Sequence, residues 1–435
     1  MCREREYGFF NGYYNIVIIR HFKISNKDEE RIYRLILIWY AVVYCFSSFN
    51  LYDLYNVSNY TIVLLTISIV MLSIGFMPKY IVHVKKTNIT YTESVYSSKI
   101  FYMLSAFAGI ILIIFLQRFL SIPSYDYYAL RMSRFQTGIV FRSLTEIMFY
   151  NYVISPFVII QMCVLIYGLW TKKIKIPLVF LCGIDILCYL IIGYGRIVFL
   201  QILFIFIVVA ICEKKERNIK KSHRRFGGKK ILLIIAAMAA AGFSMLYITV
   251  KRLGVAHITL DIMLETVQTT VKQSYVYICG AQRALDYAIV NYNDLLGRHF
   301  FRMTFSGIDE VIVNVLLFLG ISISSMNSTY GTITQKSIMI GKNVDTNALY
   351  TGIFNFYFDA GIIGILIYSV LLGVAFKYFL TRYYKRRSIP NLVILCNVAF
   401  GVFAMPIKWV FSSGDMMLLI IICLIWDNIL MRKGR

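Results

Sequence analysis

Charged side chains are scarce in this sequence, and acidic ones are fewer than basic ones. Only 15% of the 435 residues are charged, whereas 59% are hydrophobic. A soluble globular domain carries about 25% charged and roughly 45–50% apolar residues. The shortage of charge argues against a soluble protein. The mean hydropathy of +0.68 instead predicts a protein embedded in a membrane.

Sequence motifs for nucleotides and metals are also missing. The chain has no P-loop, GxGxxG, HExxH or DxD pattern, so no nucleotide or metal–nucleotide-sugar site is expected. Its nine cysteines include no CxxC pair, which argues against a zinc site or a disulfide framework. We therefore expect no metal and no cofactor. All the histidines fall in expected loops, which leaves no candidate for a catalytic histidine buried in the membrane: His21, His83, His223, His257 and His299.

The apolar residues are grouped in blocks close to the length of helix that crosses about 30 Å of hydrocarbon. No alternating strand pattern accompanies them, and lipid tolerates only helices or closed barrels. We therefore predict an all-α, polytopic membrane bundle of about 10–12 transmembrane helices, forming a single domain over residues 1–435. The expected spans are 35–55, 60–77, 98–116, 147–170, 176–193, 197–212, 231–250, 351–376, 390–407 and 414–431, with 8–19 and 308–324 ambiguous.

Basic residues concentrate in short segments beside the apolar blocks. The net charge is +23, and segments such as 213–230 and 377–388 are strongly basic. Cytoplasmic loops of membrane proteins collect lysine and arginine, so this pattern indicates topology rather than nucleic-acid binding. The expected partner of these segments is anionic membrane lipid.

Placing the basic segments inside leaves residues 251–347 as one large external loop region. Block 308–324 then dips into the membrane or lies on it, because a single crossing there would put 377–388 outside. Residues 260–278 carry apolar side chains at spacings of three and four, which is typical of an amphipathic helix. This helix is expected either on the outer leaflet or over the mouth of the bundle.

Arginines on the expected external side are the strongest functional signal. Arg196 lies between two short spans, where a charge is costly unless it faces a cavity or a partner. A lipid phosphate would suit it, since arginine binds phosphate with two hydrogen bonds; the alternative is a snorkelling side chain. Arg298 and Arg302 share a face if they are helical, and otherwise belong to a solvated loop. Arg131 and Arg134 lie in another external loop and are either binding residues or surface charge.

Carboxylates give a second set of candidates. Asp359 lies where a span begins on the external side, so it is either a general base for a sugar hydroxyl or a partner in an interhelix hydrogen bond. Asp345 is better interpreted as a helix N-cap. Asp309 and Glu310 are adjacent and do not share a helix face, so we do not interpret them as a catalytic pair.

One stretch of the chain resembles a known family. The segment NALYTGIFNFYFDAGIIG is similar to an Asn…Thr…Tyr-x-Asp-x-Gly-x-x-Gly pattern of bacterial oligosaccharide repeat-unit polymerases, the O-antigen and capsular polysaccharide polymerases. GYGRIVFL and GRHFFRMTFSGI resemble a Gly-Arg turn and part of the large external loop of that family. The resemblance covers roughly residues 180–380 in detail. Its matching positions are Asn347, Thr351, Tyr357, Asp359, Gly361 and Gly364.

The resemblance implies a GT-C-like fold in the bacterial plasma membrane and metal-independent glycosyl transfer on its external face. The substrates would be undecaprenyl-pyrophosphate-linked oligosaccharides, and a chain-length regulator is a possible partner. Arg196 and Arg302, supported by Arg298, would contact the pyrophosphate, where negative charge develops. Asp359 would be the base, with His299 as its competitor because histidine titrates nearer to neutral pH. The implied substrate-binding residues are Arg298, Arg131, Arg134, Asn347, Thr351 and Tyr357.

Three other classes of protein stay open. A flippase or transporter of the same lipid-linked sugars would have repeated halves and short loops, against which the long region 251–347 argues. An O-antigen ligase would use the same donor with a different acceptor. A structural or regulatory membrane subunit would need none of these side chains for activity.

Overall fold

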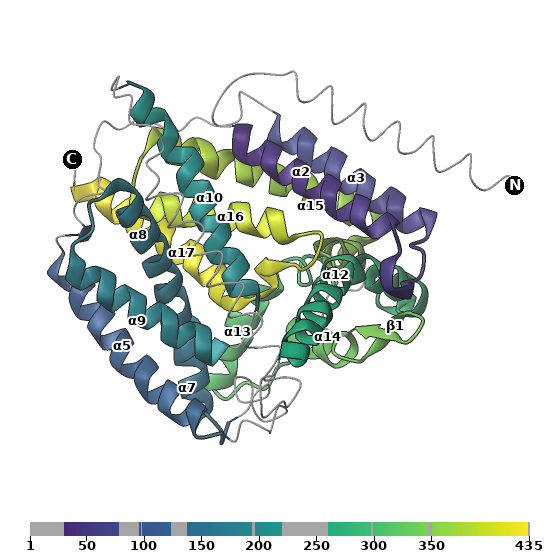
Figure 1. The fold of residues 1–435 in the computed structure, drawn as a ribbon, viewed down its shortest axis with the longest axis horizontal. Coiled ribbons are helices and arrows are strands. Elements are labelled where there is room, and N and C mark those ends of the chain that lie inside the picture. The colour runs from purple at the N-terminus through teal and green to yellow at the C-terminus, as the bar shows by residue number, and fades with distance from the viewer. Residues whose placement is uncertain are drawn as a thin grey trace, which may run out of the picture.

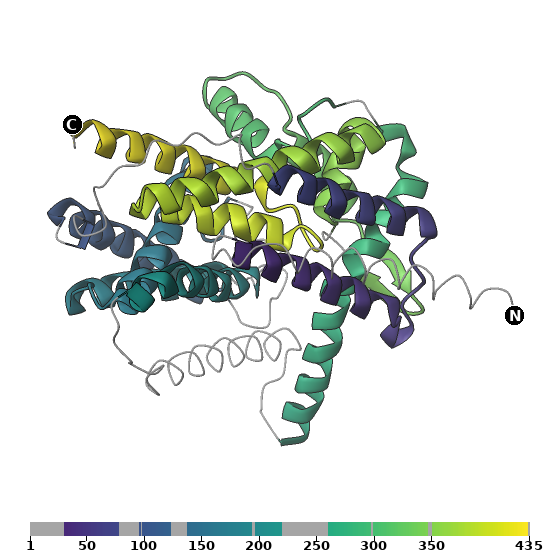
Figure 2. The ribbon, with the colours of Figure 1, turned by 90° about the horizontal axis from the view of Figure 1, so that it is seen from above.

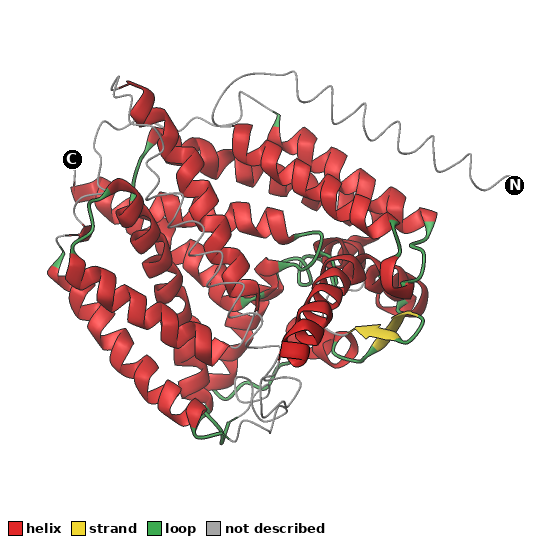
Figure 3. Cartoon of the chain, viewed as in Figure 1, coloured by secondary structure: helices red, strands yellow, loops and turns green. Residues whose placement is uncertain are grey.

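The computed structural model describes residues 30–77, 95–96, 98–122, 137–193, 196–219, 260–296, 299–346 and 350–433. Helices make up most of this part of the chain, and one short hairpin supplies its strands (Figure 3). The all-α class predicted from hydropathy is therefore confirmed. The expected spans 8–19 and 231–250 lie outside the described residues.

The apolar helices form a bundle. Within the described residues, five helical segments are long and apolar enough to cross a membrane by length and composition: α3, α5, α7–α8, α9 and α15. This agrees with a membrane bundle. The helices of the bundle are α2 (Arg31–Ser48), α3 (Asn59–Phe76), α5 (Lys99–Leu120), α7 (Leu144–Phe149), the π-helical segment Tyr150–Ile154, α8 (Ser155–Thr171), α9 (Ile176–Gly193), α10 (Arg196–Ile219), α15 (Gly352–Lys385), α16 (Ile389–Ala404) and α17 (Gly414–Lys433).

The elements outside the apolar bundle gather at one end of it, which we call the α12 end (Figure 1, lower centre and right). Figure 2 shows α12 leaving the bundle at a steep angle to the apolar helices. α13 has 13 residues and is about 20 Å long, too short to cross the hydrocarbon alone. The elements here are η2 (Leu51–Asp53), α12 (Leu260–Asn291), η4 (Asn293–Leu295), α13 (Ser306–Phe318), α14 (Met326–Thr334), β1 (Ile338–Gly341), β2 (Val344–Thr346) and η5 (Val410–Ser412).

The most deeply buried element is α16, in which every residue from Ile389 to Ala404 is buried. A helix that is apolar on all sides is stable only when other helices surround it. Large apolar side chains remain exposed on α5 and α9, among them Met103, Phe107 and Phe180. An outer surface of this kind suits contact with lipid rather than water.

Helices α3 and α15 pack closely and run in the same direction. A methyl group on Gly75 would lie 2.1 Å from the Val370 carbonyl oxygen, and one on Gly373 would lie 2.2 Å from the Leu72 carbonyl oxygen. Glycine at both positions is therefore what lets the two backbones touch. Near the other end of this contact, the hydroxyls of Tyr60 and Tyr357 lie 3.3 Å apart.

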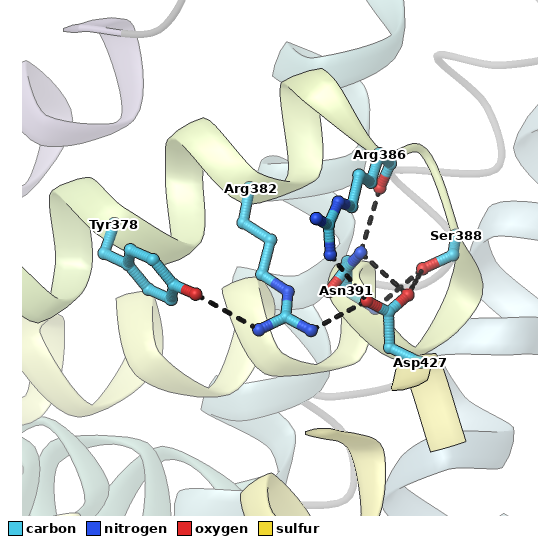
Figure 4. A network of polar contacts seen from close by, with 6 residues as sticks. All are labelled: Tyr378, Arg382, Arg386, Ser388, Asn391 and Asp427. Carbon is cyan, nitrogen blue, oxygen red and sulfur yellow. Dashed lines mark hydrogen bonds and ion pairs between the residues drawn. The ribbon is translucent and has the colours of Figure 1, made fainter. Parts of the chain in front are cut away.

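A buried polar network holds the end of α15 against α17 (Figure 4). Arg382 donates to an Asp427 oxygen at 2.7 Å, and Ser388 and Asn391 donate to the other Asp427 oxygen at 2.7 and 3.0 Å. Arg386 lies 3.9 Å from Asp427. The Asp427 side chain is only 2% exposed, and these donors replace the water that its oxygens lose on burial.

Candidate functional site

The stretch that resembles the polymerases is a broken helix. α15 is interrupted at Ala360 and Gly361, where the Gly361 φ of +62° and ψ of −144° belong to a region open mainly to glycine. A methyl group on Gly364 would lie 2.1 Å from the Phe356 carbonyl oxygen. The two glycines thus permit a break that separates the first turns of α15 from the rest of the helix. Thr351, just before α15, is buried.

Asp359 lies on the first part of α15 and holds a neighbouring loop. Its two oxygens accept hydrogen bonds from the Met303 and Thr304 amides at 2.9 and 2.7 Å. Asn355 donates to the Met303 carbonyl at 2.9 Å, and Trp409 donates to the Thr304 carbonyl at 2.7 Å. All four backbone polar groups of Met303 and Thr304 are therefore held by side chains. We call Asn355, Asp359 and Trp409 the 303–304 clamp.

The loop that the clamp holds carries two of the predicted catalytic residues. Arg302 donates to Asp309 at 2.8 Å, and Asp309 also accepts from the Met326 amide at 2.7 Å. The Arg302 side chain is still 46% exposed, so its guanidinium has donors left for a ligand. The His299 ring meets the Tyr330 ring edge to face, with centroids 5.4 Å apart. The clamp thus fixes Arg302 and His299 on one short loop.

A small cleft of about 110 Å³ lies beside this loop. Aromatic rings, amides and hydroxyls dominate its lining, and Lys408 supplies a cation. Sugars offer apolar faces and many hydroxyls, so rings and amides are the side chains that suit them. The lining residues are Met303, Ser306, Met326, Asn327, Tyr330, Gly331, Thr334, Tyr350, Phe354, Asn355, Lys408, Trp409 and Ser412.

The remaining predicted residues fall into two groups. Tyr357 is buried on α15, with its hydroxyl near that of Tyr60. Arg196 begins α10, but its side chain lies outside the described part of the chain. The convergence of Arg196 with Arg302 therefore stays a prediction. Four further residues also lie outside the described segments: Arg131, Arg134, Arg298 and Asn347.

Several residues of the site were missed by sequence reasoning. Asn327 and Trp409 carry no sequence signal beyond their residue type. Lys408 did have one, because Lys408 and Asp415 are the only charged residues between Arg387 and Asp427. An isolated charge within so long an apolar stretch is costly and marks a candidate functional position.

A buried arginine attaches α12 to the rest of the molecule. Arg283 is 3% exposed and donates to the Tyr55 and Ser47 carbonyls and to the Asn50 side chain at 2.6, 3.0 and 2.6 Å. Asp286, one turn later, accepts from the Thr61 hydroxyl at 2.6 Å. These bonds link α12 to the α2–α3 connection and serve the fold rather than the cleft.

Comparisons of the chain with protein-family models, with curated proteins and with solved structures found no match. Among the residues that the structure describes, no three or more His, Cys, Asp or Glu side chains group to hold a metal ion. The cleft and the motif are thus the features of this chain that point to a function.

Proposed function

We propose that this protein is a membrane glycosyltransferase that polymerises undecaprenyl-pyrophosphate-linked oligosaccharide repeat units into a surface polysaccharide. The cleft at the α12 end is the observation that carries the proposal. Its rings and amides suit sugar units, and its lining residues belong to the α12 end and to the first turns of α15. A lipid-linked substrate needs a cleft at the end of a membrane bundle, because its sugars remain in water while its lipid stays in the bilayer.

The proposed reaction is a displacement at the anomeric carbon. A hydroxyl of one repeat unit attacks the anomeric carbon of the sugar chain on the other lipid, and undecaprenyl pyrophosphate leaves. Positive charge near the leaving oxygens lowers this barrier, most effectively when it is held in place beforehand. Arg302 has that character, because the 303–304 clamp fixes its loop. Arg196 and Arg298 are the proposed further contacts.

We place this reaction on the external face of the bacterial plasma membrane, where the positive-inside pattern puts region 251–347. A ligase would use the same donor and leaving group, and would differ only in the acceptor. The reaction products therefore separate a polymerase, which extends one repeat unit by another, from a ligase.

The test uses purified protein and repeat units linked to undecaprenyl pyrophosphate from the native host. We expect a gel ladder spaced by one repeat unit, and we expect it to be lost in Arg302→Ala and Arg196→Ala. Lys336→Ala is the matched control, because Lys336 is an exposed cation at the same end and should leave the ladder intact.

Absence of a ladder from folded wild-type protein with verified substrate would contradict the polymerase proposal. Flipping assays and transfer to a different acceptor would then test the transporter and ligase alternatives. A ladder that survives both arginine substitutions would retain the polymerase and remove the arginines from its mechanism.

A further inference from the structure

Glu310 lies next to the cleft in a setting that no other carboxylate of the site shares. Its Oε2 atom accepts hydrogen bonds from the Asn327 side chain at 2.8 Å and from the Gly414 amide at 3.1 Å. No described residue donates to its Oε1 atom, and the side chain is only partly buried. Asn327 and Ser412 both line the cleft, so Asn327 joins Glu310 directly to the cleft wall.

The two bases implied by the resemblance are placed differently. Asp359 is fully buried, and both of its oxygens already accept backbone hydrogen bonds. His299 packs edge to face against the Tyr330 ring, with the centroids 5.4 Å apart. Glu310 keeps an oxygen that the described structure does not use. A general base needs such a free lone pair within reach of the substrate proton.

The surroundings of Glu310 favour a carboxylate that titrates closer to neutral pH. Burial raises the pKa of the Glu310 carboxyl above its ordinary value, while the bonds from Asn327 and Gly414 lower it. Asp415 raises this pKa further, and the Lys408 ammonium lowers it. Tyr152 is the other titratable group that faces Glu310. A raised pKa strengthens a carboxylate as a base at neutral pH.

We propose that Glu310 is the catalytic base of the glycosyl transfer, an inference that rests on the proposed function. The Glu310 carboxylate takes the proton of the attacking acceptor hydroxyl. That hydroxyl oxygen forms a bond to the anomeric carbon of the donor sugar. The bond from this carbon to the pyrophosphate oxygen breaks, and the leaving group keeps the electron pair. Asn327 and Gly414 position the carboxylate and touch no reacting atom.

The first experiment measures polymer formation by Glu310→Gln, which keeps the shape and an oxygen for Asn327 and Gly414. We expect kcat to fall by about 10²- to 10⁴-fold, the usual contribution of general base catalysis, with little change in KM. Asp294→Asn is the matched control, since Asp294 is an exposed carboxylate at the α12 end. Wild-type kcat in a folded Glu310→Gln variant would overturn the inference.

The second experiment follows the acidic limb of the pH profile of kcat in two charge variants. Asp415→Asn removes a negative charge that raises the Glu310 pKa, so the limb should move to lower pH. Lys408→Met removes a positive charge that lowers this pKa, so the limb should move to higher pH. Opposite shifts would support Glu310, whereas a limb that moves in neither variant would overturn the inference.

If wild-type protein makes no polymer, the proposed function fails and this inference fails with it. If Glu310→Gln makes polymer as well as the wild type, only the inference fails.

Discussion

At the scale of single residues, buried polar groups decide how the α12 end is built. Asp359 is the clearest case, because the same carboxylate that the motif marks as chemical holds the amides of Met303 and Thr304. A buried carboxylate without partners is costly, whereas one that accepts two amide bonds is stable. Its place in the motif thus has a structural reason, which is separate from the catalytic role that the resemblance implies.

Cys279 on α12 provides a residue-scale prediction. Its side chain is fully buried, and burial raises the pKa of the thiol to about 11. Since the thiolate is the reactive form, we expect slow labelling by a water-soluble maleimide at pH 7 and faster labelling as the pH rises. The rate of labelling is measured on a variant whose only cysteine is Cys279, first in the folded protein and then after the protein has been unfolded in detergent.

The matched control for this labelling is a cysteine placed at the exposed position Asp294, on the same cysteine-free background. It should react rapidly in the folded protein. Equal rates at the two positions would show that α12 does not pack against the α2–α3 connection as Arg283 holds it here.

At the scale of elements, hydropathy located the helices well and their ends less well. The expected span 176–193 coincides with α9, and 60–77 is within one residue of α3. The expected span 351–376 covers only part of α15, which continues to Lys385. Apolar content predicts only the part of a helix that lies in lipid. The helix itself continues beyond that part, because its backbone hydrogen bonds do not depend on apolar side chains.

The contact between α3 and α15 provides an element-scale prediction. Gly373→Ala would place a methyl group 2.2 Å from the Leu72 carbonyl oxygen, so the helices must separate. We expect a loss of about 1–3 kcal/mol in stability, typical of overpacking, seen as a lower melting temperature in detergent. Gly183→Ala on α9 is the control, because a methyl group there meets no atom within 4 Å. Equal melting temperatures for the two variants would contradict the close packing.

At the scale of the whole molecule, the two ends of the bundle differ in chemistry. The α12 end holds the cleft, and the opposite end holds the buried network around Asp427 and the last turns of α15 (Figures 1 and 4). Basic residues such as Arg382 and Lys385 lie in the last turn of α15. By the positive-inside rule, we expect this end to face the cytoplasm.

Orientation is therefore a prediction for the whole molecule. Single cysteines replace Thr332 on α14 and Lys175 in the α8–α9 connection, both of which are exposed. In intact cells stripped of their wall, we expect an impermeant maleimide to label the first at once and the second only after permeabilisation. The reversed pattern would put the cleft in the cytoplasm and remove its access to external repeat units.

The sequence by itself determined that this is an apolar helical bundle, because hydropathy and helix length are local properties that follow directly from composition. It also marked Asp359, Gly361 and Gly364 as one motif. Only the tertiary structure decided what those residues do. The clamp joins residues 303–304 to Asn355, Asp359 and Trp409, and Glu310 meets Gly414. Such contacts bring together residues 50 to more than 100 positions apart, and no local pattern encodes which distant groups satisfy one another's hydrogen bonds.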